Sequence, residues 1–171
     1  MKPAAAEFSR LLPADRVPRE GSTEIIKAEA NELASLAKRI GVPVLHSLSA
    51  VLRVEPWRGG GLKVSGGFTA DLEQVCVVTL DRFRSKVEAP VERVYLPEAA
   101  VADAVEEDVD HLVDGAADLG ELVTETVVLS LDPYPRKPGA SFAGAEVGAE
   151  SPSSSFADLA VLRKGMKPRI P

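Results

Sequence analysis

The sequence has few of the residues that most often build reactive or membrane-embedded sites. Its 171 residues include one cysteine, and only 5% are aromatic. A single cysteine, Cys76, excludes a disulfide within the chain and fits a reducing compartment. No apolar run approaches the roughly 20 residues that a transmembrane helix needs, and Met1 to Arg10 lacks the apolar core of a secretory signal. We therefore expect a cytoplasmic protein with an aliphatic core and no membrane partner.

Positive charge is missing from one long segment. Between Val94 and Pro135 there are eleven acidic residues and no lysine or arginine, so the net charge of −6 hides two unlike parts. The rest of the chain carries 20 basic and 15 acidic residues and is mildly basic. Because acidic surface repels phosphate and basic surface attracts it, only this remainder suits a nucleic-acid partner. A solvated loop is the plainer interpretation of the acidic segment.

Hydrophobic periodicity indicates the main elements. Apolar residues at helical spacing predict one helix over 29–40 and a second over 118–131. Alternating apolar and polar residues predict two strands, 47–54 and 62–73, joined by a glycine-rich turn. A third long strand is predicted over 83–95, where apolar odd positions alternate with charged even positions.

These elements together predict an α+β fold. We expect an antiparallel sheet of three long strands plus short edge strands at 7–12 and 23–28, with the apolar Val75–Leu80 as a further buried strand or strand end. Two main helices would pack on one face of that sheet, followed by a short C-terminal helix. The expected organisation is one domain over 1–138 with an exposed acidic loop at 98–117, a flexible linker over 139–155, and the last helix with a disordered tail over 156–171.

The residues give little sign of catalysis. His46 and His111 lie in different contexts, and neither has metal-ligand spacing to another histidine or to the cysteine. A nucleophilic pair of Cys76 and His46 stays open, but the apolar neighbours of Cys76 favour a structural thiol. We expect no enzyme activity, no metal, no cofactor and no small-molecule substrate.

Basic residues give the one physical indication of a binding surface. Arg82, Arg84 and Lys86 alternate, so they share one side of a predicted strand. Trp57, beside the glycine turn, is suited either to stack on a base or to cap the edge of the core. An ordinary solvated sheet face is the plainer explanation of the cations. The candidate nucleic-acid-binding residues are Arg53, Arg58, Lys63, Arg82, Arg84, Lys86, Arg93, Arg136 and Lys137.

The segment DPYPRKPG, from Asp132 to Gly139, is stiff. Its three prolines fix φ and remove three backbone donors, so the segment is extended and cannot continue the helix before it. Two interpretations follow. The segment pins that helix against the sheet, or it presents Tyr134, Arg136 and Lys137 to a partner at the point where positive charge resumes.

Several motifs follow one another in an order that is informative as a set. They are GGFTADLEQVCVVTL ending at Leu80, YLP ending at Pro97, DLGELV starting at Asp118, DPYPRKPG, and FADLA at 156–160. Over most of the chain they resemble the YceD family, the large ribosomal RNA subunit accumulation proteins, and most closely its alphaproteobacterial branch. The positions that carry the resemblance are Cys76, Thr79, Leu80, Pro97, Asp118, Leu119, Gly120, Glu121, Pro133 and Pro135.

The resemblance implies a cytoplasmic factor for large-subunit ribosomal RNA and brings no enzymatic activity with it. Many members of the family carry Cys-x-x-Cys at the signature, and some carry further cysteines that look like zinc ligands. Here Thr79 takes the second position and the proline-rich segment has no cysteine. A zinc site with four protein ligands is therefore not available within one chain.

Two functions are consistent with these features of the sequence. The first is a non-catalytic ribosome-assembly factor that supports accumulation or maturation of large-subunit ribosomal RNA by binding that RNA or a precursor particle. The alternative is a protein-interaction adaptor whose acidic loop binds a basic ribosomal protein or a ribonuclease without touching RNA. Salt-sensitive binding to RNA is expected only for the first.

Overall fold

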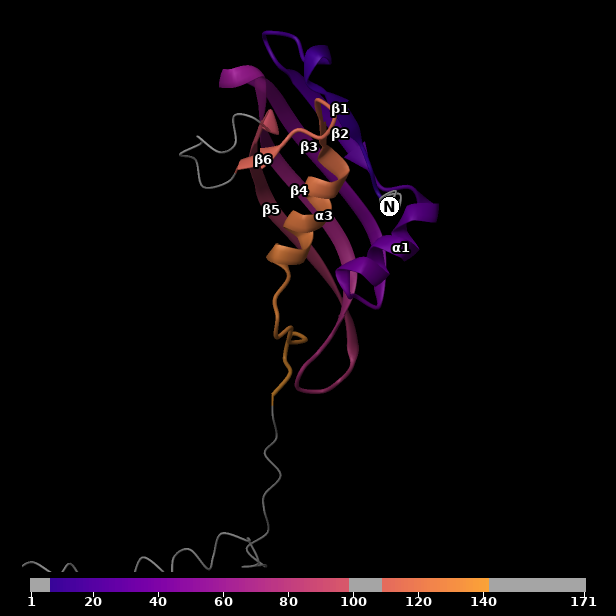
Figure 1. Cartoon of the computed structure of the whole chain (residues 1–171). Helices are drawn as coiled ribbons and strands as arrows, with labels where there is room; N and C mark the ends of the chain where they lie inside the picture. Colours follow the sequence, from indigo (N-terminus) through magenta and orange to yellow (C-terminus); the bar gives the residue numbers. More distant parts are fainter. Residues whose placement is uncertain (1–6, 99–108, 142–171) are drawn as a thin grey trace, which may run out of the picture. The chain divides into compact units, whose positions relative to one another are not determined.

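The protein is built around one long, curved sheet, which the computed structural model describes for residues 7–98 and 109–141 (Figure 1). The sheet has the order β2-β3-β4-β5-β6. Its first three pairings are antiparallel, whereas β5 and β6 run parallel. The strands are β2 (Ser22–Lys27), β3 (Val44–Trp57), β4 (Gly61–Val75), β5 (Arg82–Leu96) and β6 (Val109–His111).

A separate two-stranded sheet pairs the N-terminal segment with a much later one. Strand β1 (Leu11–Pro13) is antiparallel to β7 (Ala116–Asp118). The predicted fold class is therefore wrong in its sheet. The structure is mostly β, and it has a mixed five-stranded sheet plus this small second sheet rather than one antiparallel sheet with three long strands.

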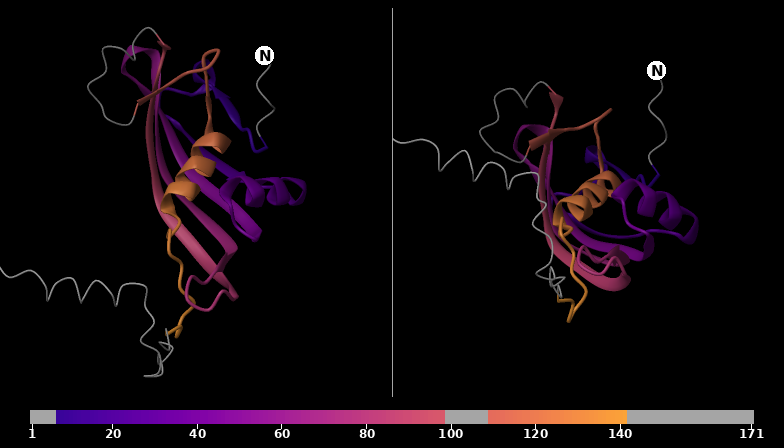
Figure 2. Two further views of the ribbon diagram at one scale, coloured as in Figure 1. Left: turned by 60° about the horizontal axis from the view of Figure 1, so that its bottom comes forward. Right: turned by 90° about the horizontal axis from the view of Figure 1, so that it is seen from below.

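Two helices in the described residues lie on the same face of the large sheet (Figure 2). Helix α1 (Ala30–Ile40) contacts β3, and helix α3 (Leu119–Ser130) contacts β5 and α1. Each begins at a carboxylate: Glu29 and Glu32 form a capping box on α1, and Asp118 accepts the backbone N–H groups of Gly120 and Glu121 on α3. Neither helix is long and apolar enough to cross a membrane.

Alternation along most of the long strands fixes which residues face the helices; it is interrupted by a register shift between Leu45 and Ser47 of β3. Phe68, Ala70 and Leu72 of β4 are buried, and the odd-numbered residues between them point to the opposite face. The helix-covered side is called the inner face below, and the other side the outer face. The core on the inner face is mainly leucine, valine and alanine, as the low aromatic content predicts.

Other predicted elements have mixed outcomes. The helices and the three long strands are present, and 23–28 corresponds to β2. The edge strand predicted at 7–12 is β1 at Leu11–Pro13, in the small sheet. The predicted acidic loop contains β6 and β7, whereas 99–108 lie outside the described residues. The predicted linker and C-terminal helix, from residue 142 onward, also lie outside them.

Candidate nucleic-acid interface

Most of the predicted cations lie on the outer face of the sheet. Register pairs Glu73 with Arg84 and Asp71 with Lys86, so these alternating side chains share the face that no described helix covers. Arg53 and Lys63, on β3 and β4, lie on the same face nearer to the other end of the sheet. The prediction that alternation places these residues on one surface is correct.

That surface is not strongly positive, because carboxylates are interleaved with the cations. Arg84 donates two hydrogen bonds to Asp71, at 2.7 and 2.6 Å. Its guanidinium lowers the pKa of the Asp71 carboxyl. Three more outer-face pairs follow the same pattern: Lys63–Glu92 at 2.8 Å, Lys86–Glu88 at 2.5 Å and Arg53–Glu55 at 3.5 Å. A phosphate backbone would therefore meet a nearly balanced set of charges.

Arg93 does not belong to this surface. It lies opposite Val64 on the inner face, and its guanidinium donates to Asp110 of β6 at 3.1 Å. Its side chain is 20% exposed. The structure thus assigns Arg93 to the contact between β5 and β6 rather than to the predicted phosphate-contacting set.

Trp57 is half-buried at the end of β3, next to two cations of its own chain. The Lys63 Nζ lies 5.4 Å and the Arg58 Cζ 5.9 Å from its ring centroid. Its indole Nε1 is buried and has no hydrogen-bond partner in the described residues. The ring therefore packs against its own neighbours instead of standing open for a base.

The β4–β5 hairpin closes in a tight turn at its other end. Of the two alternatives predicted for Val75–Leu80, a buried strand is wrong, and the segment is the end of β4 followed by this turn. Strand β4 ends at Val75; the Cys76 N–H then donates to the Asp81 carbonyl at 2.8 Å, and the Leu80 N–H to the Cys76 carbonyl at 2.9 Å. Leu80 has a φ of 62°, the left-handed region that bulky residues avoid. The apolar run that predicted a strand here is instead largely exposed.

The proline segment Asp132–Gly139 docks on this turn. The Val77 N–H donates to the Pro135 carbonyl at 2.9 Å, and the Lys137 Nζ lies 3.4 Å from the Asp81 carboxylate. Cys76 is fully buried between the two parts, where its sulfur accepts from the Thr79 hydroxyl and from the backbone N–H of Lys137. These donors lower the pKa of the thiol to about 7.

The surroundings of Cys76 do not fit a zinc ion. The chain supplies one thiol, and Thr79 at the second signature position is a hydroxyl that donates to it. The nearby carboxylate of Asp81 is paired with a cation, Lys137. Hydrogen bonds and this ion pair connect the turn to the proline segment.

Among the side chains that stay exposed on the turn and the docked segment, we call four the tip surface: Leu80, Arg82, Tyr134 and Arg136. Leu80 is 76% and Tyr134 70% exposed. Arg82 and Arg136 are exposed and form no ion pair within the described residues. The Asp132 side chain accepts the Tyr134 N–H at 2.8 Å and so fixes the backbone that carries the ring. The sequence predicts the two arginines as binding residues and Leu80 only as a signature position, because an apolar run favours burial.

The remaining signature residues position the other end of α3. Asp118 accepts the Arg10 N–H at 2.8 Å and the Ser9 hydroxyl at 2.6 Å, and Glu121 pairs with Arg39 of α1. A Cβ on Gly120 would lie 2.3 Å from the Phe8 carbonyl oxygen, so only glycine permits this approach. Leu119 is buried, and Pro97 follows the end of β5.

Catalytic residues are not brought together in the described part of the chain. Cys76 is buried, and His46 Nε2 lies 3.4 Å from a carboxylate oxygen of Glu73 on the outer face. The burial removes the premise of the Cys76–His46 nucleophile pair, which requires an accessible thiol.

The fold and the exposed side chains define a β-sheet protein whose candidate site is an exposed surface at one end of a hairpin. The family model described as "Large ribosomal RNA subunit accumulation protein YceD" matches residues 64–163, which is more than half of the chain. The chain belongs to this family, and membership implies a role in the accumulation of large-subunit ribosomal RNA. No curated protein and no solved structure matches it.

Proposed function

We propose that the protein is a non-catalytic ribosome-assembly factor of the cytoplasm that binds large-subunit ribosomal RNA, or a precursor particle containing it, through the tip surface. One observation carries the proposal: docking of the proline segment on the turn brings to one end of the hairpin an exposed aromatic ring and two exposed arginines that form no ion pair within the described residues. Arginines contact phosphates, and an aromatic ring stacks on bases. A rigid display lowers the conformational entropy that binding would otherwise cost.

The tip surface favours unpaired RNA over duplex. Bases within an A-form helix are stacked on each other and offer no face to a tyrosine ring, whereas bases in loops do. Leu80 adds an apolar side chain to the same end of the hairpin. We therefore expect the target to be a loop, a bulge or a single-stranded stretch of the ribosomal RNA.

Binding to transcribed large-subunit RNA, followed by fluorescence anisotropy over a range of salt concentrations, tests the proposal. The variant Arg82→Glu/Arg136→Glu should lose at least about tenfold in affinity and lower the salt slope by about 1 to 2. The matched control is Arg16→Glu/Arg19→Glu, which makes the same charge change at two exposed residues far along the chain from the tip. Equal losses in both variants, or no binding of the wild type at low salt, would contradict direct recognition by the tip.

A further inference from the structure

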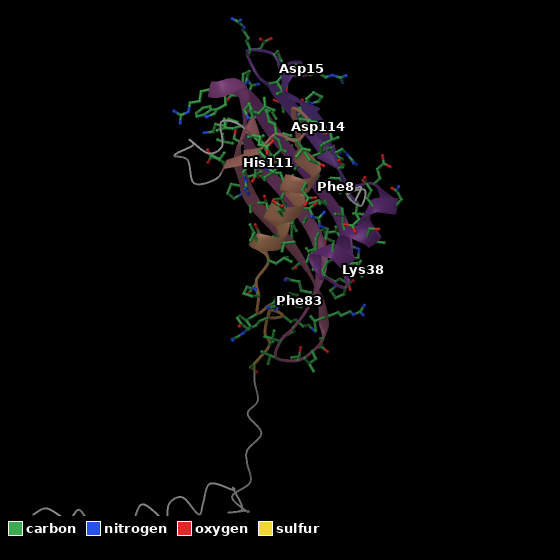
Figure 3. All side chains as sticks on the ribbon, viewed as in Figure 1. Phe8, Asp15, Lys38, Phe83, His111 and Asp114 are labelled. Carbon is green, nitrogen blue, oxygen red and sulfur yellow. The ribbon has the colours of Figure 1, made fainter. Side chains whose placement is uncertain are left out.

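A second surface lies near the other end of β5. A cavity of about 190 Å³ opens between β5, β6 and α3, and we call it the acidic groove. Its lining includes Leu11, Tyr95, Asp110, Val113, Glu121 and Glu125. His111, which also lines it, is at this end of the molecule in Figure 3, far from Phe83 at the hairpin end. A volume of this size suits one long side chain rather than a folded partner.

Tyr95 gives the groove an unused polar group. The residue is 6% exposed, and its hydroxyl makes no hydrogen bond within the described residues. Burial and the negative charges of Asp110 and Glu125 raise the pKa of Tyr95, so the hydroxyl stays protonated. This hydroxyl belongs to a largely buried side chain that lines the cavity, so a ligand in the cavity can form a hydrogen bond with it.

The carboxylates around the groove differ in whether their charge is already compensated. Asp110 is paired with Arg93, and Glu121 with Arg39. Glu125 is exposed and forms no ion pair within the described residues. It belongs to the segment between Val94 and Pro135 that contains no lysine or arginine. The Glu125 carboxylate also acts on Arg39, which raises the pKa of that guanidinium. The groove lining nevertheless has four carboxylates, and the two described arginines paired with them are Arg39 and Arg93, so a cation that enters would meet an excess of negative charge.

The rim of the groove is apolar. Leu11 is 65% and Val113 58% exposed, and both lie beside the acidic side chains in the lining. An arginine side chain has a matching division, with an apolar stem and a planar charged head that donates several hydrogen bonds. Its stem would cover Leu11 and Val113 while its head meets Glu125 and the Tyr95 oxygen.

We propose that the acidic groove binds an arginine side chain from a basic protein partner. This goes beyond RNA binding by the tip and gives the protein a second, independent contact. The basic partner expected from the acidic segment would thus be recognised by a formed groove on β5 and α3. Bound RNA is disfavoured here because the carboxylates repel phosphate.

Titration with a labelled hexa-arginine peptide tests the groove, with hexa-glutamate as the negative probe. The variant Glu125→Gln should weaken hexa-arginine binding about tenfold, the loss expected for one charge-assisted contact. The variant Glu55→Gln is the matched control, because Glu55 is an exposed glutamate on the outer face. Its affinity for the peptide should equal that of the wild type.

The variant Tyr95→Phe separates binding from folding. It removes a hydroxyl that has no described partner, so the thermal midpoint should stay or rise while peptide affinity falls about threefold. No binding of hexa-arginine, equal losses in Glu125→Gln and Glu55→Gln, or a lowered midpoint with unchanged affinity in Tyr95→Phe would each overturn the inference. The result is independent of the tip, because Arg82→Glu/Arg136→Glu should bind the peptide as the wild type does.

Discussion

The tip surface and the acidic groove lie near opposite ends of strand β5 and are built in different ways. Arg82 begins the strand and Tyr95 nearly ends it, so an extended backbone separates them by about 40 Å. The tip consists of a turn and a proline segment joined by a few hydrogen bonds. The groove rests on β5, β6 and the first two turns of α3.

The comparison teaches that the net charge of the chain describes neither surface. Between the two ends, the outer-face cations Lys63, Arg84 and Lys86 are each paired with a carboxylate. At the tip, Arg82 and Arg136 form no ion pair within the described residues, and in the lining of the groove carboxylates outnumber their arginine partners. The signs there are opposite. The two proposals together assign RNA to one end and a basic protein to the other. Variants that affect one end and spare the other test whether the two surfaces are in fact separate.

The largest effect on stability is expected from Gly120→Ala, a substitution at the groove end of the protein. The new Cβ would meet the Phe8 carbonyl oxygen at 2.3 Å, and the backbone that carries Phe8 must then move away from α3. We expect a loss of about 3 kcal/mol in the free energy of unfolding, measured with urea. The same shift should weaken hexa-arginine binding, since Leu11 follows on that segment. If the affinity for RNA fell as much as the affinity for hexa-arginine, the two surfaces would be coupled.

The second-largest effect is a pH-dependent change in stability that comes from Cys76, next to the tip surface. In the folded state the N–H and hydroxyl donors around the sulfur favour the thiolate, so the folded pKa of about 7 is lower than the usual thiol value. The resulting stabilisation is present above the unfolded pKa, and it is lost as the pH falls through 7. The variant Cys76→Ser keeps an acceptor but does not titrate.

The measurement for Cys76 is the thermal midpoint of wild type and Cys76→Ser between about pH 6 and pH 9. The wild-type advantage should increase with pH by several degrees. Hexa-arginine binding should be the same in both proteins at each pH. An advantage that is constant, or that shrinks as the pH rises, would mean that the folded state does not favour the thiolate.

A smaller change in stability, with a clear change in binding, is expected from Leu80→Gly. Glycine relieves the left-handed backbone, although it raises the entropy of the unfolded chain, so the free energy of unfolding should be unchanged or higher by up to about 1 kcal/mol. RNA affinity should fall about threefold because the apolar contact is lost. Leu129→Ala, at a leucine that is 79% exposed on α3, should leave RNA affinity unchanged.

Hydrophobic periodicity predicts the helices and strands that bury one face. It does not predict short strands or turns, whose structure depends on local hydrogen bonds. The stripes of α1 and α3 and the alternation of β3, β4 and β5 are repeated signals over many residues. Strand β6 has only three residues, too few to show a period or a direction, so the parallel pairing could not be predicted. The apolar run up to Leu80 has the composition of a strand, but the turn bonds of Cys76 bend it.

The candidate site was predictable in its residue types and less so in its charges. Alternation places Arg84 and Lys86 on one face. The pairing of Arg84 with Asp71 depends on the register with β4, which the sequence does not reveal, whereas Lys86 pairs with Glu88 of its own strand. The sequence does not decide whether the proline segment pins the preceding helix against the sheet or presents its side chains to a partner. In the structure its residues divide: Pro135 and Lys137 contact the turn, whereas Tyr134 and Arg136 are exposed.

The smallest effect is expected from Arg84→Gln/Lys86→Gln on RNA binding. Arg84 is paired with Asp71, and Lys86 with Glu88. Each cation must leave its carboxylate before it can bind a phosphate, so it adds little to RNA affinity. We expect a loss of less than about threefold, compared with about tenfold for Arg82→Gln/Arg136→Gln, which removes the same charge. Anisotropy at one low salt concentration decides between them. Equal losses would mean that RNA covers the outer face as well, and that charge pairing in the free protein does not mark where it binds.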